Sequence, residues 1–118
     1  MERELLLVED DDVQRKQMAR VLKAEGYTVC ESSTGEEALH ILDERKIALV
    51  LTDKFMPDRD GLSLLKHIRL RHPGVPVIIM TGLAAEEDLE PQPDALLIKP
   101  FSSEDLRRLV RSLLAHVQ

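Results

Sequence analysis

The sequence predicts an α/β fold in which helices cover both faces of a single parallel β-sheet. Short apolar runs alternate with longer segments of helical spacing along the whole chain, which is typical of right-handed strand–helix–strand units. The runs LLLV, ALVL and VIIM are apolar throughout, as expected of strands that are buried on both sides. A length of 118 residues suits one domain. A single doubly wound domain is therefore the expected architecture.

Five segments have the apolar content and length of strands. They comprise residues 5–8, 28–32, 47–52, 75–80 and 95–98. The second segment, TVCES, is more mixed than the others. It is therefore expected at an edge of the sheet, where one side of the strand is less covered.

Four helices are expected between and after these strands. They run from residue 11 or 12 to 25, from residue 33 or 34 onward, over 61–71, and from residue 102 or 103 onward. A residue that can cap a helix opens each of them except the third. Gly26 supplies the stop signal for the first, and the third stops before His72-Pro73 because a proline disfavours helix at the preceding residue.

The segment between the fourth and fifth strands departs from this alternation. It reads TGLAAEEDLEPQPD, and neither Pro91 nor Pro93 can occupy a helix interior. We expect residues 84–94 to be mostly loop, with a turn or two of helix at best over residues 84–89. The fourth helix of a doubly wound domain is therefore shortened or missing here.

Composition excludes several classes of function. The chain has 22 acidic and 16 basic residues, a net charge of −6, whereas a nucleic-acid-binding surface needs concentrated Lys and Arg. No apolar run approaches the ~20 residues that a membrane span requires. The single cysteine, Cys30, cannot form an internal disulfide, which favours a reducing compartment and a cytoplasmic location. With no linker in the sequence, we expect residues 1–118 to be one domain that carries no output domain.

Charged and hydroxyl side chains occur where the predicted strands end. Glu9 and Asp10 follow the first strand, Asp53 the third, Thr81 the fourth and Lys99 the fifth. The carboxyl ends of parallel strands meet at one edge of a sheet, where ligands bind. Each residue alone has an ordinary explanation as a loop, turn or surface residue, but their shared position favours a common site.

Such a cluster suits a divalent metal and phosphoryl transfer. Two carboxylates about 4 Å apart repel each other by roughly 4 kcal/mol at an effective dielectric constant near 20. A bound Mg²⁺, which prefers carboxylate, water and phosphate oxygens, removes this repulsion. Asp53 could then attack a phosphoryl group as a nucleophile, while Thr81 and Lys99 hold its remaining oxygens.

The segments that carry these residues resemble the motifs of response-regulator receiver domains in two-component signalling. LLLVEDD resembles the first strand and acidic pair, and LTDKFMPDRDGLSLLKHIR the phosphoacceptor segment. VPVIIMTG resembles the fourth strand with its switch hydroxyl, and IKPF the fifth strand with its Lys-Pro pair. The resemblance covers nearly the whole chain. It implies a flavodoxin-like sheet of five parallel strands in the order 2-1-3-4-5, and a cis Lys99–Pro100 bond.

The resemblance also implies a role for each site residue. Asp53 would be the phosphoacceptor, and Thr81 and Lys99 would contact its phosphoryl group. The Mg²⁺ ligands would be Glu9, Asp10, Asp53 and the backbone carbonyl of Phe55. The phosphoryl donor would be a histidine kinase or a histidine phosphotransfer protein, and the switch would act on a downstream effector protein or domain.

Two features differ from the family pattern. The segment from Thr81 to Lys99 is shorter than usual, and Leu96 occupies the position on the fifth strand that usually holds the Tyr or Phe of the switch.

Phe55 and Leu83, two residues after the phosphoacceptor and the switch hydroxyl, are apolar and cannot orient a water molecule. We therefore expect a signalling switch that catalyses only its own phosphotransfer and a slow autodephosphorylation.

Three other functions are less compatible with the sequence. A phosphatase with an aspartyl nucleophile typically has a second acid two residues later, where this chain has Phe55, and a cap domain. An adaptor independent of phosphorylation would not need the carboxylates, Thr81 and Lys99, although Leu96 would suit it. A flavin-binding domain would need a phosphate loop and more aromatic residues than one Tyr and two Phe. The histidines, which have no predicted role, are His40, His67, His72 and His116.

Overall fold

The computed structural model of the chain describes residues 3–82 and 90–115. Within these residues the elements follow one another as β1 (Glu4–Val8), α1 (Asp12–Ala24), β2 (Thr28–Ser32), α2 (Gly35–Glu44), β3 (Leu49–Asp53), α3 (Gly61–Arg71), β4 (Val77–Thr81), β5 (Ala95–Ile98) and α4 (Ser103–Ala115). No helix in this part of the chain is long and apolar enough to cross a membrane.

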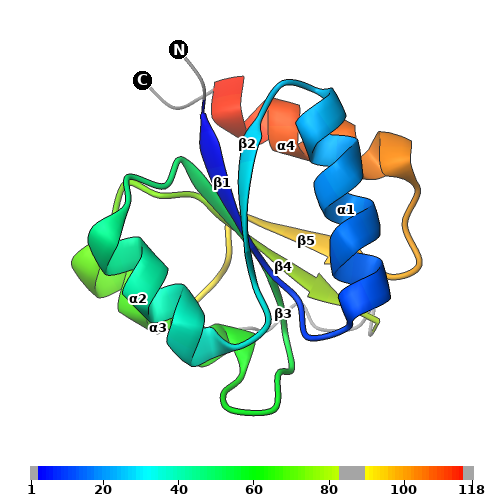
Figure 1. Cartoon of the computed structure of the whole chain (residues 1–118). Coiled ribbons are helices and arrows are strands. Elements are labelled where there is room, and N and C mark those ends of the chain that lie inside the picture. The colour runs from blue at the N-terminus through cyan, green and yellow to red at the C-terminus, as the bar shows by residue number, and fades with distance from the viewer. Residues whose placement is uncertain (1–2, 83–89, 116–118) are drawn as a thin grey trace.

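The five strands form one parallel sheet in the order β2-β1-β3-β4-β5. Helices α1 and α4 cover one face, and α2 and α3 cover the other (Figure 1). The doubly wound fold, its strand order and the edge position of β2 are therefore as predicted, and the four helices among residues 3–82 and 90–115 fit a domain with a shortened fourth helix.

The core consists of two apolar layers, one on each face of the sheet. Successive side chains of a strand point to opposite faces, so the all-apolar run of β1 supplies both layers. Leu5 and Leu7 pack with Leu22 of α1 on one face, whereas Leu6 packs with Leu65 of α3 on the other. All five are fully buried. This two-sided burial explains why the central strands lack polar alternation.

A polar side chain caps each helix, as the sequence indicated for all but α3, whose Asp60 cap was not predicted. The side chains that accept a hydrogen bond from a backbone N–H in the first turn are Asp11, Thr34, Asp60 and Ser102. Each satisfies a donor that has no partner within its helix. The helices therefore begin where capping residues are available.

The boundaries of β3 and β4 differ from the predicted segments 47–52 and 75–80. Both strands begin two residues later and end one residue later, at Asp53 and Thr81. Before β4, Pro76 has no N–H to donate to the ladder, although its carbonyl accepts from Val50. Asp53 and Thr81 therefore belong to the hydrogen-bonded sheet itself and do not lie in loops after it.

The segment between β4 and β5 is described only in part. Gly82 and residues 90–94 contain no helix, whereas Leu83 and residues 84–89, on which the predicted loop mainly rests, lie outside the described residues. Asp94 is bonded to β4, since its carboxylate accepts from the N–H of Val77 at 2.7 Å. The cis Lys99–Pro100 bond is present as expected, and Glu90–Pro91 is also cis.

Candidate functional site

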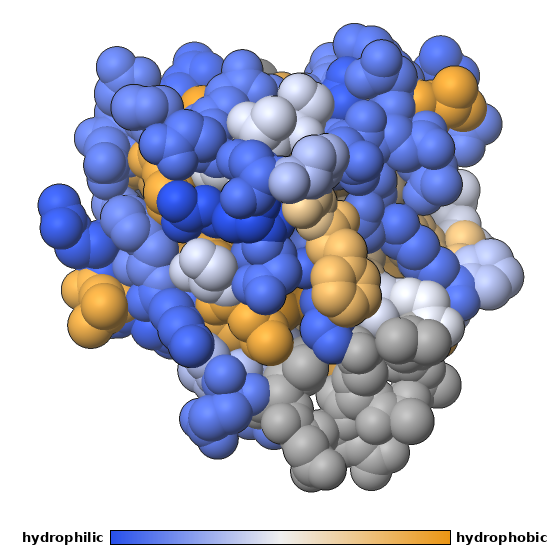
Figure 2. Space-filling view, turned by 90° about the horizontal axis from the view of Figure 1, so that it is seen from below, coloured by the Kyte–Doolittle hydropathy of each residue, from blue (hydrophilic) through white to orange (hydrophobic). Residues whose placement is uncertain are grey.

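The predicted convergence of carboxylates at the carboxyl edge of the sheet is found. One carboxylate oxygen from each of Glu9, Asp10 and Asp53 lies within 4.8 Å of the others. Glu9 and Asp53 are buried and Asp10 is exposed. Figure 2 views the molecule from this edge and shows a mostly hydrophilic surface with isolated hydrophobic side chains. The acidic cluster thus extends from two buried carboxylates, Glu9 and Asp53, to the exposed Asp10 at the hydrophilic surface.

Lys99 bridges two of the three carboxylates. Its Nζ lies 2.7 Å from Oδ1 of Asp53 and 3.1 Å from Oε2 of Glu9. Its backbone N–H donates to the carbonyl of Thr81 at 2.8 Å, which continues the β4–β5 ladder past the end of β5. The ammonium therefore reaches the Asp53 carboxylate from a backbone position fixed by the sheet.

The electrostatics of the cluster fit a divalent cation. Burial raises the pKa of Glu9, and the neighbouring Asp53 carboxylate raises it further. Burial would lower the pKa of Lys99, but its hydrogen bonds and charge interactions with Asp53 and Glu9 outweigh that effect and raise it. Three carboxylates face one ammonium, so an excess of negative charge is held on oxygen ligands. Hard dications such as Mg²⁺ prefer this donor set.

Thr81 and Phe55 are placed differently. Met80 pairs with Asp53 across the ladder, so Thr81, the next and last residue of β4, is buried beside the end of β3. Phe55 lies in the loop after Asp53, with its side chain 64% exposed and the Lys54 ammonium 5.0 Å from its ring centroid. The fold therefore brings together Glu9, Asp10, Asp53 and Lys99 directly, places Thr81 alongside, and leaves the Phe55 side chain in solvent.

Leu96 occupies a β5 position inside the sheet. It pairs with Ile79 of β4 and is partly buried against the core layer beneath α2 and α3. An aliphatic side chain packed here cannot supply the ring that the family pattern has at this position.

The loop that follows Asp53 is anchored to α2 by a contact that the sequence did not indicate. The carboxylate of Asp58 accepts from the N–H groups of Gly35 and Glu36 at 3.0 and 2.9 Å. Burial would raise the pKa of Asp58, but these backbone donors outweigh it and lower that pKa. Arg59 adds an ion pair to Glu36 at 3.4 Å. Nothing in the local spacing around Asp58 points to a helix more than twenty residues away, so this contact could not be predicted.

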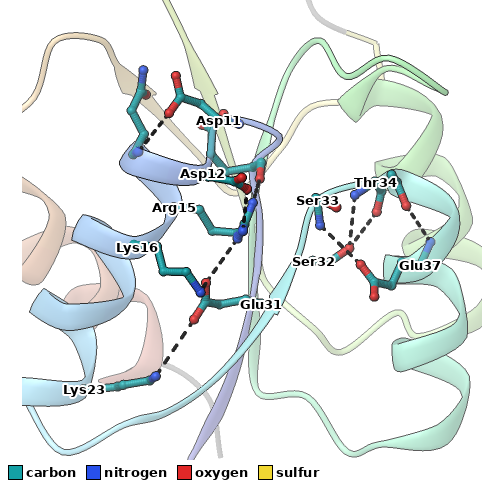
Figure 3. Close-up of polar contacts among 12 residues, drawn as sticks. Asp11, Asp12, Arg15, Lys16, Lys23, Glu31, Ser32, Ser33, Thr34 and Glu37 are labelled. Carbon is teal, nitrogen blue, oxygen red and sulfur yellow. Dashed lines mark hydrogen bonds and ion pairs between the residues drawn. The ribbon is translucent and has the colours of Figure 1, made fainter.

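Arg15 holds the acidic loop after β1. This is a second contact that the sequence did not indicate. Its guanidinium donates to the carbonyl of Glu9 at 2.8 Å and pairs with Asp12 at 2.7 Å and Glu31 at 3.1 Å. Figure 3 shows the side chain extending from α1 between Asp12 and Glu31 of β2. Arg15 is 9% exposed, and its charge-assisted bond to the Glu9 carbonyl is buried, which fixes the backbone next to the cluster.

Most of the chain matches one protein family. A family model described as response regulator receiver domain matches residues 5–111. Sensor kinase CckA of Brucella abortus is 39% identical over 116 residues, which cover 93% of this chain and 12% of CckA. Transcriptional regulatory protein SrrA of Staphylococcus aureus is 31% identical over 122 residues, which cover 100% of this chain and 50% of SrrA. The chain thus spans at most half the length of these two relatives.

Solved structures agree with this match. The receiver domain of hybrid histidine kinase CckA has a TM-score of 0.81 at 36% identity and covers 94% of this chain and 98% of its own. A CheY-like receiver domain of Methanospirillum hungatei has a TM-score of 0.91 at 29% identity, with 98% and 95% covered. Response regulator TrrA of Thermotoga maritima, in complex with Mg²⁺-BeF, has a TM-score of 0.88 at 28% identity, with 94% and 98% covered. Sequence, fold and family match together show that the chain belongs to the family of response regulator receiver domains.

Proposed function

We propose that this domain accepts a phosphoryl group on Asp53 in a Mg²⁺-dependent reaction and thereby acts as a signalling switch. The observation that carries the proposal is the cluster at the carboxyl edge of the sheet. The buried Asp53 carboxylate lies 2.7 Å from the Lys99 ammonium and within 4.8 Å of the Glu9 and Asp10 carboxylates.

Each residue has a distinct role in the proposed transfer. An oxygen of Asp53 attacks phosphorus, and the bond from phosphorus to the donor's imidazole nitrogen breaks with its electron pair left on that nitrogen. Lys99 then holds a phosphoryl oxygen in place of the Asp53 oxygen, and the Thr81 hydroxyl donates to another. Mg²⁺ would be held by Glu9, Asp10, Asp53 and the Phe55 carbonyl. When bound, it neutralises the charge of the phosphoryl oxygens.

The donor is a histidine kinase or a histidine phosphotransfer protein, and the readout is binding to a downstream effector protein or domain. Two relatives, a sensor kinase and a transcriptional regulator, match this chain over only part of their length, which supports a module that serves different outputs. With Leu96 at the switch position, the readout depends on contacts other than an aromatic rotation. The single free cysteine, Cys30, supports a location in the reducing cytoplasm.

The proposal predicts that a small-molecule phosphodonor with Mg²⁺ adds one phosphoryl group to the wild type and none to Asp53→Asn. The amide of asparagine cannot act as the nucleophile, whereas the rest of the cluster is kept. Intact-mass spectrometry measures the labelled fraction. Asp105→Asn, an exposed aspartate on α4, serves as the matched control and should label like the wild type.

The same assay separates the alternative functions. A phosphatase would release phosphate from the donor over many turnovers, and an adaptor independent of phosphorylation would remain unlabelled with Mg²⁺ present. Equal labelling of Asp53→Asn and wild type would place the nucleophile elsewhere and overturn the assignment of Asp53.

We also infer that the phosphoryl group is lost slowly, because Phe55 cannot hydrogen-bond an attacking water. Its side chain is 64% exposed, so it packs little against the described residues. A group that orients or activates water can speed a step by ~10²-fold or more. We therefore expect Phe55→Asn to shorten the lifetime of the phosphoryl group. Following the phosphorylated mass over time tests this, with Leu70→Asn, equally apolar and 81% exposed on α3, as the control. If wild type loses its label within seconds and Phe55→Asn is no faster, water exclusion by Phe55 is wrong.

A further inference from the structure

Two histidines and one aspartate meet at the C-terminal ends of α2 and α3. One ligand atom from each of Asp43, His67 and His72 lies within 4.8 Å of the others. Asp43 is in the last turn of α2 and His67 in the middle of α3, whereas His72 is the C-cap of α3. The backbone of His72 leaves the helix with φ −139° and ψ 59°, and its ring centroid lies 6.2 Å from that of His67.

The spacing of the cluster suits a tetrahedral metal ion. Nε2 of His72 lies 3.3 Å from Oδ1 of Asp43. Ligands bound to zinc at about 2.0–2.1 Å in a tetrahedron are about 3.4 Å apart, so these two atoms already have the separation of a ligand pair. Two imidazoles and one carboxylate are donors that Zn²⁺ commonly uses, with water in a fourth position.

A buried nitrogen of His67 supports this interpretation independently. Nε2 of His67 is buried and has no hydrogen-bond partner among the described residues. Most buried side-chain polar atoms are paired, because leaving one without a partner costs free energy. A metal ion that accepts the lone pair of Nε2 would give this nitrogen a partner. It would also explain why a histidine occupies a partly buried position between two helices.

The C-terminal ends of the two helices also favour a cation. The C-terminal ends of α2 and α3 lie side by side at the sheet edge opposite the phosphorylation site (Figure 1). Each helix C-terminus carries partial negative charge from its unsatisfied carbonyls. The nearby guanidinium of Arg69 pairs with Asp94 at 2.9 Å, so it is engaged by the segment before β5.

We propose that Asp43, His67 and His72 form a zinc-binding site that links the C-terminal ends of α2 and α3. The site shares no residue with the acidic cluster and lies at the other edge of the sheet. Zinc binding there would fix the two helices that cover one face of the sheet relative to each other. The site is therefore separable from phosphorylation by substitution.

Titration of the metal-free full chain with Zn²⁺ by calorimetry, in saturating Mg²⁺ to occupy the acidic cluster, tests the proposal. We expect one zinc per chain. Removing even an outer-sphere partner of a metal costs about 10–100-fold in affinity, so Asp43→Asn and His72→Gln should each weaken binding at least that much. Both side chains are partly exposed, His72 by 24% and Asp43 by 51%, so these variants should fold. Co²⁺ in place of zinc should give the intense visible absorption of a tetrahedral complex in the wild type and lose it in His67→Gln.

Two control variants make the result decisive. His40→Gln removes an exposed histidine of α2 outside the cluster and should bind zinc like the wild type. Asp53→Asn should also retain zinc, because the nucleophile belongs to the other edge. The proposal is overturned if the wild type takes up no zinc beyond the Mg²⁺-competed site, or if Asp43→Asn and His72→Gln bind it as tightly as the wild type.

Discussion

Gly61→Ala is expected to lower the free energy of unfolding by about 2–3 kcal/mol, the upper part of the range for overpacking substitutions. A Cβ at Gly61 would lie 2.5 Å from the carbonyl oxygen of Asp53 and 3.1 Å from Cα of Lys54. These are backbone atoms at the end of a buried strand, so they cannot move without disturbing the β3 ladder. Alanine is otherwise the better helix former by up to about 1 kcal/mol, which makes destabilisation a specific signature of the close approach.

Urea unfolding followed by circular dichroism measures this effect, and the chain offers a matched control. A Cβ at Gly74 would meet nothing within 4 Å, and Gly74 does not have a left-handed backbone. Gly74→Ala should therefore change stability by no more than about 0.5 kcal/mol, or stabilise slightly by restricting the unfolded chain. Equal unfolding midpoints for the two variants would show that the helix can shift away from Asp53 at little cost.

The close approach at Gly61 could not be predicted from the sequence, whereas the fold class and the site could. The fold class followed from patterns that are local and repeated, namely the apolar strands and the capped helices between them. The site followed from one topological rule, since the residues at strand ends must meet at the carboxyl edge of a parallel sheet. This rule placed Glu9, Asp53 and Lys99 together although they are far apart in the chain.

Contacts that depend on side-chain direction across elements could not be predicted in this way. Asp58 reaches the start of α2, and Arg15 reaches the carbonyl of Glu9 from α1. Nothing in the spacing of these residues distinguishes them from ordinary turn or helix-surface residues. The pairing of His67 with His72 depends on the backbone leaving the helix at His72, whereas helical spacing alone would place residues five apart on different sides.

Lys99→Met is expected to have the largest effect on the metal-free domain, a loss of about 3 kcal/mol of unfolding free energy at neutral pH. Methionine keeps most of the length of the side chain but leaves the Glu9 and Asp53 carboxylates without their shared ammonium. Their side chains are only 2% and 11% exposed, and removing one partner of a buried ion pair costs about 3–5 kcal/mol. The 27% exposure of Lys99 places the expected loss at the lower end. Lys66→Met, which removes an exposed lysine of α3, should change stability by less than about 0.5 kcal/mol.

Mg²⁺ should restore much of this loss, since it neutralises the same carboxylates. At about 100 times its dissociation constant, a ligand that binds only the folded state stabilises it by about 2.7 kcal/mol, and Asp10→Ala should remove most of that response by deleting a proposed ligand. Thermal unfolding of each variant with and without Mg²⁺ provides the measurement. Combining Lys99→Met with Asp53→Asn leaves Glu9 as the one buried carboxylate of the cluster, so the double variant should be more stable than Lys99→Met alone. A Lys99→Met domain that is as stable as the wild type would mean that water relieves the repulsion between the carboxylates. A melting temperature that does not change with Mg²⁺ in either protein would mean that the cluster does not hold a metal.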